Sequence, residues 1–257
     1  MKLNYRQYST AGHPLLILHG LFGSLSNWNW QSNKLSEQYA VCALDLRNHG
    51  ASPHADQMDY PAMALDVIEF MDEHNISSAH LLGHSMGGKV AMQLALEHPQ
   101  RVDRLIVADI APVKYASEHD QIFDGLQAID LEKIKSRTDA DKVLAEYVED
   151  EVVRQFLLTN LVRSPNGGFQ WRVNLPVLAK SYQQLRSAMT GEKAFDKPVL
   201  FIKGALSNYI TEEHQQEIGK KFPQARLKTI MQTGHWLHAE KPQTFYHLVN
   251  DFLSQPE

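Results

Sequence analysis

Gly83-His84-Ser85-Met86-Gly87 lies between an apolar run, Ala79 to Leu82, and an amphipathic stretch that ends near His98. A G-x-S-x-G motif between a strand and a helix is typical of a nucleophile elbow, a strained turn that exposes a serine hydroxyl. Small residues are needed on both sides because flanking Cβ atoms would clash in such a turn. The motif therefore predicts that Ser85 is a nucleophile.

Two other interpretations of this segment are weaker. Gly83 to Lys89 also fits the G-x-x-x-x-G-K pattern of a phosphate-binding loop. That loop needs Ser or Thr at the next position to hold magnesium, and Val90 stands there instead. A glycine-rich turn in which Ser85 only caps a helix is the remaining alternative. The elbow is favoured because a strand and a helix are expected on its two sides.

Short apolar runs alternate with longer amphipathic stretches toward both ends of the chain. Their hydrophobicity is continuous, which indicates strands covered on both faces, and stretches such as Pro61 to Glu73 and Gly87 to His98 supply helical crossovers. We therefore predict an α/β fold with a doubly wound, mostly parallel sheet. The expected strands are Leu15 to Leu18, Tyr39 to Leu46, Ala79 to Gly83, Arg104 to Ile110, Val199 to Lys203 and Arg226 to Met231.

The interval from about Lys114 to Ala194 breaks this rhythm, because its pattern is helical and contains no convincing buried strand. Pro112 and the segment from Gly191 to Lys197 bracket it. We predict a core formed by residues 1–112 and 195–257 and a helical cap insertion formed by residues 113–194. The expected cap helices are Asp130 to Lys135, Asp139 to Asn160 and Leu175 to Met189.

A serine nucleophile needs a base, and the best of the 13 histidines is His235. It lies in Thr233-Gly234-His235-Trp236-Leu237, directly after the last predicted strand. A turn at this point would return the imidazole to the edge of the sheet where Ser85 emerges. The resulting chain order of serine, acid and histidine suits a catalytic triad.

The acid of the triad is harder to identify. Its usual place is the turn Gly204 to Ile210, which has no carboxylate and carries Ser207 where an aspartate is expected. Either Glu212 or Glu213 reaches in, or the acid comes from another strand. We favour Asp109, at the end of an otherwise apolar strand, because burial there is costly unless a partner such as the Nδ1 hydrogen of His235 is present.

Acyl transfer also needs donors for the developing oxyanion, and His19-Gly20-Leu21-Phe22-Gly23 provides a backbone loop after the first buried strand. We assign the role to the backbone N–H groups of Leu21 and Met86, with Phe22 as a substitute for Leu21. Aromatic residues near the site are candidate substrate contacts, although core packing is an equal alternative for the cap segment. These candidates are Phe22, Trp171 and Trp236.

A polar turn, Asp45-Leu46-Arg47-Asn48-His49-Gly50-Ala51-Ser52, follows the second long apolar run. Charged residues in a tight turn that contains glycine more often brace a sheet edge through hydrogen bonds than act on a substrate. We therefore predict a structural role for Asp45 and Arg47.

Composition excludes several classes of protein. The chain has 257 residues, 43% hydrophobic and 21% charged, which is typical of a globular protein and not of a disordered one. The 25 basic and 30 acidic residues give a net charge of −5, so no basic surface for nucleic acid is expected. Cys42 is the only cysteine, which rules out an internal disulfide.

The same inspection predicts a cytoplasmic protein without a membrane span, a metal or a cofactor. No apolar run approaches the roughly 18 residues of a span, and the first residues lack the apolar core of a signal peptide. His80 and His84 are four residues apart, but they lie on an expected strand and turn and not on a helix, so they do not form a zinc-protease motif. His235 and His238 lack a nearby third ligand.

Taken together, the motifs resemble those of the α/β-hydrolase superfamily. Within it, His19 to Ser24, Gly83 to Lys89 and Val107 to Pro112 are similar to the small bacterial YbfF-type esterases. The resemblance implies an α/β-hydrolase fold with a helical cap, acting on acyl esters or acyl-CoA thioesters, and it supports Asp109 as the acid. The turn from Gly204 to Ile210 departs from the broader superfamily because it lacks the acid.

We therefore expect a serine esterase that acts on a small acyl ester through an acyl-enzyme on Ser85. Serine rather than aspartate at this position argues against dehalogenase or epoxide hydrolase chemistry. An acyl-CoA thioesterase is an alternative, with Lys89, Lys114 or Arg172 at the pocket rim to bind phosphates. Hydrolysis or elimination at a C–C bond and a non-catalytic receptor on the same fold are the others, and the oligomeric state is left open.

Overall fold

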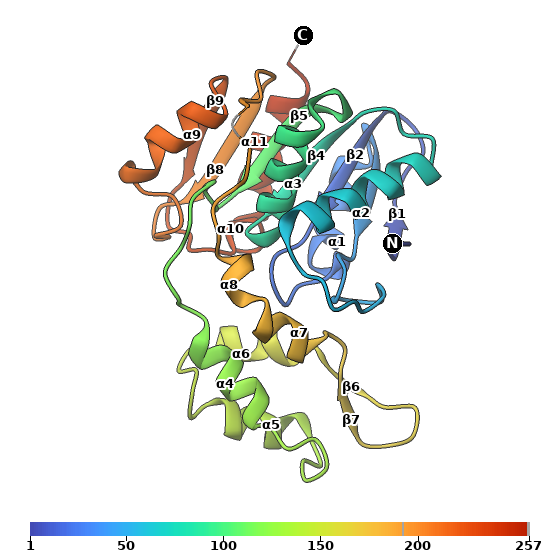
Figure 1. The fold of residues 1–257 in the computed structure, drawn as a ribbon, viewed down its shortest axis with the longest axis vertical. Coiled ribbons are helices and arrows are strands. Elements are labelled where there is room, and N and C mark those ends of the chain that lie inside the picture. Colours follow the sequence, from blue (N-terminus) through green and yellow to red (C-terminus); the bar gives the residue numbers. More distant parts are fainter. Residues whose placement is uncertain (192, 256–257) are drawn as a thin grey trace.

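The protein forms one large twisted sheet, described by a computed structural model that covers residues 1–191 and 193–255 (Figure 1). The sheet has seven strands in the order β1-β3-β2-β4-β5-β8-β9, and all neighbours are parallel except the edge pair β1 and β3. Its strands are β1 (Tyr5–Gln7), β2 (His13–Leu18), β3 (Tyr39–Leu44), β4 (Ala79–His84), β5 (Val102–Ala108), β8 (Val199–Gly204) and β9 (Ala225–Ile230).

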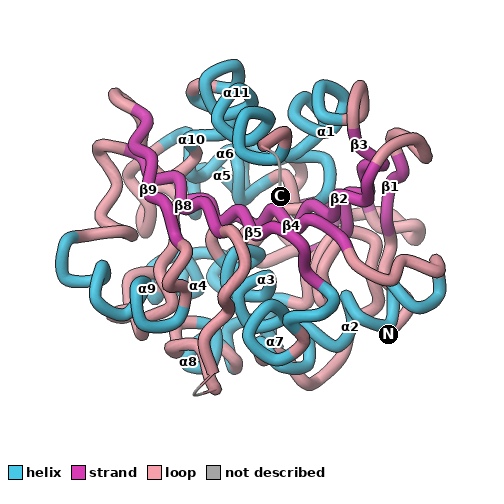
Figure 2. Tube along the Cα trace, turned by 90° about the horizontal axis from the view of Figure 1, so that it is seen from above, coloured by secondary structure: helices cyan, strands magenta, loops and turns pink. Residues whose placement is uncertain are grey.

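Helices cover both faces of this sheet (Figure 2). One face carries α2 (Tyr60–Glu73), α3 (Met86–Glu97) and α9 (Gln215–Lys221), and the other carries α1 (Asn29–Leu35), α10 (Leu237–Glu240) and α11 (Pro242–Leu253). Short 3-10 turns occur at η1 (Leu25–Trp28), η2 (Pro99–Arg101) and η3 (Glu212–His214). The predicted doubly wound α/β architecture is confirmed.

The buried strands divide their side chains between two apolar layers. In β2, Leu16 and Leu18 belong to one core cluster, whereas Leu15 and Ile17 belong to the other. All four are fully buried. A strand covered on both faces therefore needs apolar residues at every position. The edge strand β9 is the exception: it was predicted to be buried, but four of its six residues are exposed.

The strands differ from their predicted bounds by up to two residues, except β1, which was not predicted. The strand predicted as Arg104 to Ile110 is Val102–Ala108, so Asp109 follows it instead of lying within it. β1 has three residues, all exposed, at the edge of the sheet. It contains no apolar run and therefore gives no signal in the sequence.

The segment between β5 and β8 contains small helices and a hairpin that lie together below the carboxyl ends of the strands in Figure 1. It contains no fully buried strand among the described residues, but β6 and β7, which were not predicted, pair as a partly exposed antiparallel hairpin. Its elements are α4 (Asp120–Ala128), α5 (Arg137–Leu144), α6 (Glu151–Leu158), β6 (Leu161–Arg163), β7 (Phe169–Trp171), α7 (Leu175–Lys180) and α8 (Tyr182–Leu185).

The predicted helices of this segment are also corrected. The helix predicted from Asp139 to Asn160 is two helices, because Asp150 accepts hydrogen bonds from the N–H groups of Val152 and Val153 and so begins α6 anew. The stretch from Asp130 to Lys135 forms a turn and no helix. The stretch from Leu175 to Met189 divides into α7 and α8, and α4 was not predicted.

In the part of the chain that the structure describes, no helix is both long enough and apolar enough to cross a membrane.

Candidate active site

Ser85 lies in a tight turn between β4 and α3. Its backbone is in the left-handed region, with φ 51° and ψ −117°, which is strained for a residue with a Cβ. A Cβ on Gly83 would lie 2.2 Å from the carbonyl oxygen of Gly87, and one on Gly87 would lie 2.4 Å from that of Leu18. Glycine on both sides therefore allows the elbow to form, as the motif predicts.

Asp109 and His235 form a direct pair. His235 Nδ1 lies 2.8 Å from Asp109 Oδ2, and the aspartate side chain is completely buried. The backbone N–H of Gly204 donates to Oδ1 over 3.1 Å, and the Ser207 hydroxyl donates a short hydrogen bond to Oδ2. These donors offset the cost of burying a carboxylate.

Ser207 stands in the turn after β8, where an acid was expected and the sequence has none. The residue at the usual place of the acid donates to a carboxylate that comes from β5 instead. Glu212 and Glu213 are exposed in η3, and within the described residues neither has a hydrogen bond or ion pair to His235. Sequence reasoning missed this role of Ser207, although its short polar side chain in that slot was the available signal.

Three other histidines surround the His235 region and are held neutral by burial. Burial lowers the pKa of His84 well below its ordinary value, that of His119 to about 4 and that of His238 to about 3. His84 Nε2 lies 2.9 Å from the carbonyl oxygen of His235 and, as its donor, fixes the backbone there. The ring of Tyr209 stacks on His235 with centroids 4.1 Å apart. These contacts orient the imidazole without adding a second positive charge.

The loop after β2 lies against the nucleophile. A Cβ on Gly20 would approach the Ser85 Cβ to 3.4 Å. Within the described residues, the backbone N–H groups of Leu21 and Met86 have no hydrogen-bonding partner. The N–H of Phe22, in contrast, donates to His49 Nε2 over 3.2 Å. Leu21 and Met86 are thus free to bind an oxyanion, and Phe22 is not.

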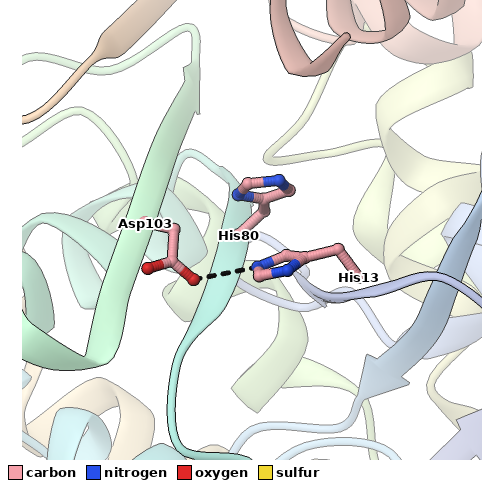
Figure 3. A group of neighbouring side chains, drawn as sticks. All are labelled: His13, His80 and Asp103. Atoms are coloured by element: carbon pink, nitrogen blue, oxygen red, sulfur yellow. Dashed lines mark hydrogen bonds and ion pairs between the residues drawn. The ribbon is translucent and has the colours of Figure 1, made fainter. Parts of the chain in front are cut away.

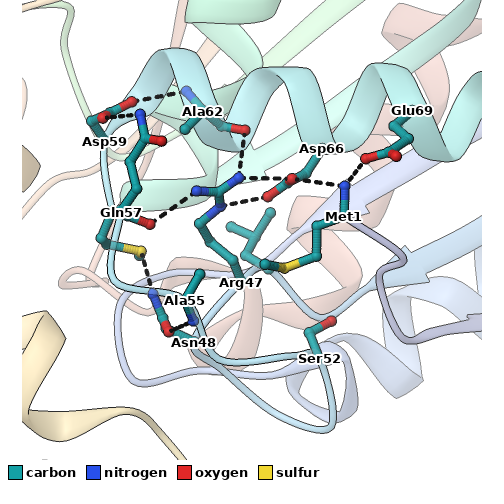
Figure 4. A network of polar contacts seen from close by, with 12 residues as sticks. Met1, Arg47, Asn48, Ser52, Ala55, Gln57, Asp59, Ala62, Asp66 and Glu69 are labelled. Carbon is teal, nitrogen blue, oxygen red and sulfur yellow. Dashed lines mark hydrogen bonds and ion pairs between the residues drawn. The ribbon is translucent and has the colours of Figure 1, made fainter.

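The polar turn from Asp45 to Ser52 holds this loop in place. Leu46 N–H donates to His19 Nε2 over 3.0 Å, and Leu25 N–H donates to Asp45 Oδ1 over 2.7 Å. Arg47 makes two hydrogen bonds to the carboxylate of Asp66 in α2, at 2.6 and 2.8 Å (Figure 4). The predicted structural role of Asp45 and Arg47 is confirmed.

A cavity of about 830 Å³ opens beside Ser85 and His235, and both residues line it. A volume of this size is ample for a small-molecule substrate. One wall comes from the sheet loops and the other from the segment between β5 and β8. Leu21, Phe22 and Trp236 also line this cavity.

A second cavity of about 50 Å³ also borders Ser85, and Met86 and Lys89 are among its lining residues. Trp171 lines neither of these two cavities; it is half-buried in the β6–β7 hairpin, where it pairs with Leu161. Phe156, which sequence reasoning missed, lines the larger cavity from α6. Its ring packs against that of Trp236, with the ring centroids 5.6 Å apart.

The three basic residues that the thioesterase alternative would place at the pocket rim do not line the larger cavity. Lys89 is buried, and its ammonium donates to the carbonyl oxygens of Val113 and Ser187, at 2.8 and 2.5 Å. Burial lowers the pKa of this lysine to about 7. Lys114 and Arg172 line neither cavity. The charged residues that do line the larger cavity, apart from histidines, are Glu118, Asp150 and Glu240.

Comparisons with known proteins agree with this geometry. A family model described as alpha/beta hydrolase fold matches residues 13–242. The chain is 41% identical to the sn-1-specific diacylglycerol lipase ABHD11 of Xenopus laevis, over 98% of this chain and 83% of that protein. It is 38% identical to esterase YbfF of Escherichia coli (strain K12), over 99% of this chain and 100% of that protein. A solved structure titled marine microorganism esterase superposes with a TM-score of 0.95 at 41% identity, covering 98% of this chain and 99% of that one.

Proposed function

The chain belongs to the α/β-hydrolase fold family and is a serine hydrolase of the esterase and lipase kind, and on this premise we propose that it hydrolyses uncharged acyl esters through an acyl-enzyme on Ser85. The observation that carries the proposal is the Asp109–His235 pair, at 2.8 Å, opening on the same cavity as Ser85. A buried acid that orients a histidine beside an elbow serine is the arrangement acyl transfer requires.

In the proposed mechanism, His235 Nε2 removes the proton of the Ser85 hydroxyl as its oxygen attacks the ester carbonyl. Asp109 accepts from Nδ1–H, which selects the required tautomer and stabilises the imidazolium. The N–H groups of Leu21 and Met86 stabilise the oxyanion of the tetrahedral intermediate. His235 then protonates the leaving alcohol, and a water molecule activated by the same histidine releases the acid. Every step uses groups of the chain and water.

The assignment of Asp109 as the acid is part of this proposal. Its support is the contact with His235 and the convergence of Gly204 and Ser207 on the same carboxylate. Exposure of Glu212 and Glu213 weakens the alternative.

The substrate class follows from the charge of the larger cavity. Among the described residues, its lining includes acidic groups and no lysine or arginine. A cavity of this kind repels the phosphates of coenzyme A and favours a neutral substrate, because like charges brought together are destabilising in a partly desolvated site. Uncharged acyl esters therefore fit better than acyl-CoA thioesters. The diacylglycerol lipase relatives support the same class, since their named substrate is a neutral ester.

We also propose that residues 113–194 act as the cap that sizes the substrate. The larger cavity takes part of its lining from α4 and α6 and from the loops before them. Apolar members of this wall would contact an acyl or alkyl chain, whereas the sheet loops hold the reacting atoms. The residues concerned are Ile122, Val152, Val153, Phe156 and Leu157.

The test is kcat/KM for neutral esters of graded acyl length and for the matching acyl-CoA thioesters, with Ser85→Ala as the blank. We expect ester hydrolysis that disappears in Ser85→Ala and exceeds thioester hydrolysis at each chain length. A thioester preference would overturn the charge argument but leave the serine mechanism intact. Failure of both series to exceed the blank would leave C–C bond chemistry, and failure of a fluorophosphonate to label Ser85 would indicate a receptor.

A further inference from the structure

Three side chains with metal-ligating groups meet at the amino ends of the central strands, at the opposite end of the sheet from Ser85. His13 is the first residue of β2, His80 the second residue of β4 and Asp103 the second residue of β5. These three strands are adjacent in the sheet. The residues are far apart in sequence, and the parallel topology is what brings them together (Figure 3).

A bulge between β4 and β5 aims Asp103 at this cluster. Asp103 and Arg104 of β5 together stand opposite His80 of β4, because the pairing register shifts at this point. An extra residue of this kind re-aims a side chain that a regular ladder would direct to the other face. Asp103 consequently reaches His13 across the intervening strand, although β2 and β5 are not neighbours.

The three side chains are as close together as the ligands of one metal ion. One ligand atom of each residue lies within 4.8 Å of the other two. His13 Nε2 is 2.9 Å from Asp103 Oδ2, and the two imidazole rings have centroids 4.3 Å apart. Figure 3 shows the Asp103 carboxylate directed at the His13 ring, with the His80 ring beside it.

His80 provides an independent sign of a missing partner. Its side chain is 7% exposed, and its Nδ1 is buried without a hydrogen-bonding partner among the described residues. Buried polar atoms are nearly always satisfied, so an orphaned imidazole nitrogen needs an explanation.

Two cationic side chains lie near the cluster. Lys197 Nζ lies 3.9 Å from Asp103 Oδ1, while its hydrogen bond goes to the carbonyl oxygen of Val102. Arg104 is directed away, toward the carbonyl oxygen and the ring of Phe252. Lys197 contacts the carboxylate oxygen that His13 does not use.

We propose that His13, His80 and Asp103 bind a divalent transition-metal ion of the zinc class. Two imidazoles and one carboxylate are ligands that suit Zn²⁺, and water completes the coordination. His13 is 44% and Asp103 26% exposed, which gives the ion a path from solvent. The site ties the amino ends of three strands together, so its effect is on stability and is separate from hydrolysis at the other end of the sheet.

The first measurement is a titration of the intact protein with Co²⁺, which reports protein-bound tetrahedral coordination through its visible absorption. We expect one ion per chain in wild type and loss of the signal in His13→Gln, His80→Gln and Asp103→Asn. His247→Gln changes another exposed histidine and is the matched control, which should behave as wild type. Ester hydrolysis by each variant shows that it is folded.

The second measurement is the thermal midpoint with added Zn²⁺. At about 100 times its Kd, a bound ion should raise Tm by roughly 5–10 °C in wild type and in His247→Gln. His13→Gln and Asp103→Asn should lose this rise, whereas Lys197→Ala should bind Zn²⁺ more tightly. Absence of a Co²⁺ signal in wild type with excess metal, or a signal unchanged in His13→Gln and Asp103→Asn, would overturn the proposal.

Discussion

The two walls of the larger cavity are built in different ways. In the sheet wall, Ser85 and Asp109 directly follow the buried strands β4 and β5, and His235 lies in the turn after the edge strand β9. Backbone hydrogen bonds fix this wall; Ser85 N–H donates to the carbonyl oxygen of Ala108 over 3.0 Å. The wall from residues 113–194 is formed by short helices with exposed apolar side chains, of which Val152 is 69% exposed.

This difference separates two tasks. Positions that hold reacting atoms must be accurate to a fraction of an ångström, and strand ends provide that accuracy. A surface that only surrounds an acyl chain tolerates adjustment, and short helices with partly exposed residues suffice. Substitutions in the sheet wall should therefore change kcat, and substitutions in the other wall should change which substrate is preferred.

The largest effect is expected for Asp109→Asn in the sheet wall. It removes the acceptor for His235 Nδ1–H, and kcat should fall by about 10⁴. Steady-state kinetics on the best ester measures this, with Glu212→Gln and Glu213→Gln as controls that should keep wild-type kcat. A nearly normal kcat in Asp109→Asn, or an equal loss in either glutamine variant, would move the acid elsewhere.

A smaller loss is expected when Asp109 stays and one of its donors is removed. Ser207→Ala deletes a hydrogen bond to a buried carboxylate, which is worth about 1.5–3 kcal/mol, so kcat should fall roughly 10- to 100-fold. Leu206→Ala, at an exposed neighbouring position, is the matched control and should have no effect. An unchanged kcat in Ser207→Ala would show that the sheet wall does not depend on this support.

In the opposite wall, Phe156→Ala should alter substrate choice. The ring lines the cavity and contacts Trp236, so its loss enlarges the acyl site and should change the ratio of kcat/KM between long and short esters by about 10-fold. The rate of fluorophosphonate labelling of Ser85 should stay unchanged. Phe169→Ala, in the β7 strand away from the cavity, serves as control. A loss of labelling in Phe156→Ala would contradict the separation of tasks.

The smallest effect concerns acid stability of the sheet wall. Burial lowers the pKa of His49 and of His238 from 6.5 to about 3, so the folded protein keeps both rings neutral while the unfolded chain binds protons below pH 6.5. The free energy of unfolding is therefore unaffected by these rings above pH 6.5. As the pH falls from 6.5 toward 3, it decreases by about 1 kcal/mol per pH unit for each ring.

Urea unfolding between pH 7 and 5 measures this slope. His238→Phe fills the place between Trp28 and Phe245 with a ring that does not titrate, so its slope should be smaller. His247→Gln, at an exposed position, should keep the wild-type slope. Equal slopes in wild type and His238→Phe would show that this buried ring does not contribute.

The sheet and its strand ends were predictable because their cause is local. A strand buried on both faces must be apolar throughout, and Gly83 and Gly87 are required by steric clash at the elbow, so both leave clear patterns in the sequence. The contact of Asp109 with His235 was predictable because a charge at the end of an apolar strand demands a partner. The arrangement of Asp109 with Ser207 was not, since it depends on the pairing of β5 with β8.

The remaining differences between prediction and structure have two causes: contacts between residues distant in sequence, and short local signals. The helices of residues 113–194 are interrupted by caps such as Ser136 and Asp150, which a periodic apolar pattern conceals. The His13, His80 and Asp103 cluster requires three strands and a bulge, and the spacing of histidines along the chain contains no trace of it.

The contacts of Lys89 bear on the design of chimeras between related proteins. Its ammonium binds the carbonyl oxygens of Val113 and Ser187, which lie where the chain leaves the sheet toward the inserted helices and where it returns. One side chain of α3 thus connects the two ends of the inserted segment. A chimera that exchanges the segment between these two points should fold when the recipient protein has a lysine at this position. The substrate preference of the chimera should then be that of the protein that donated the segment.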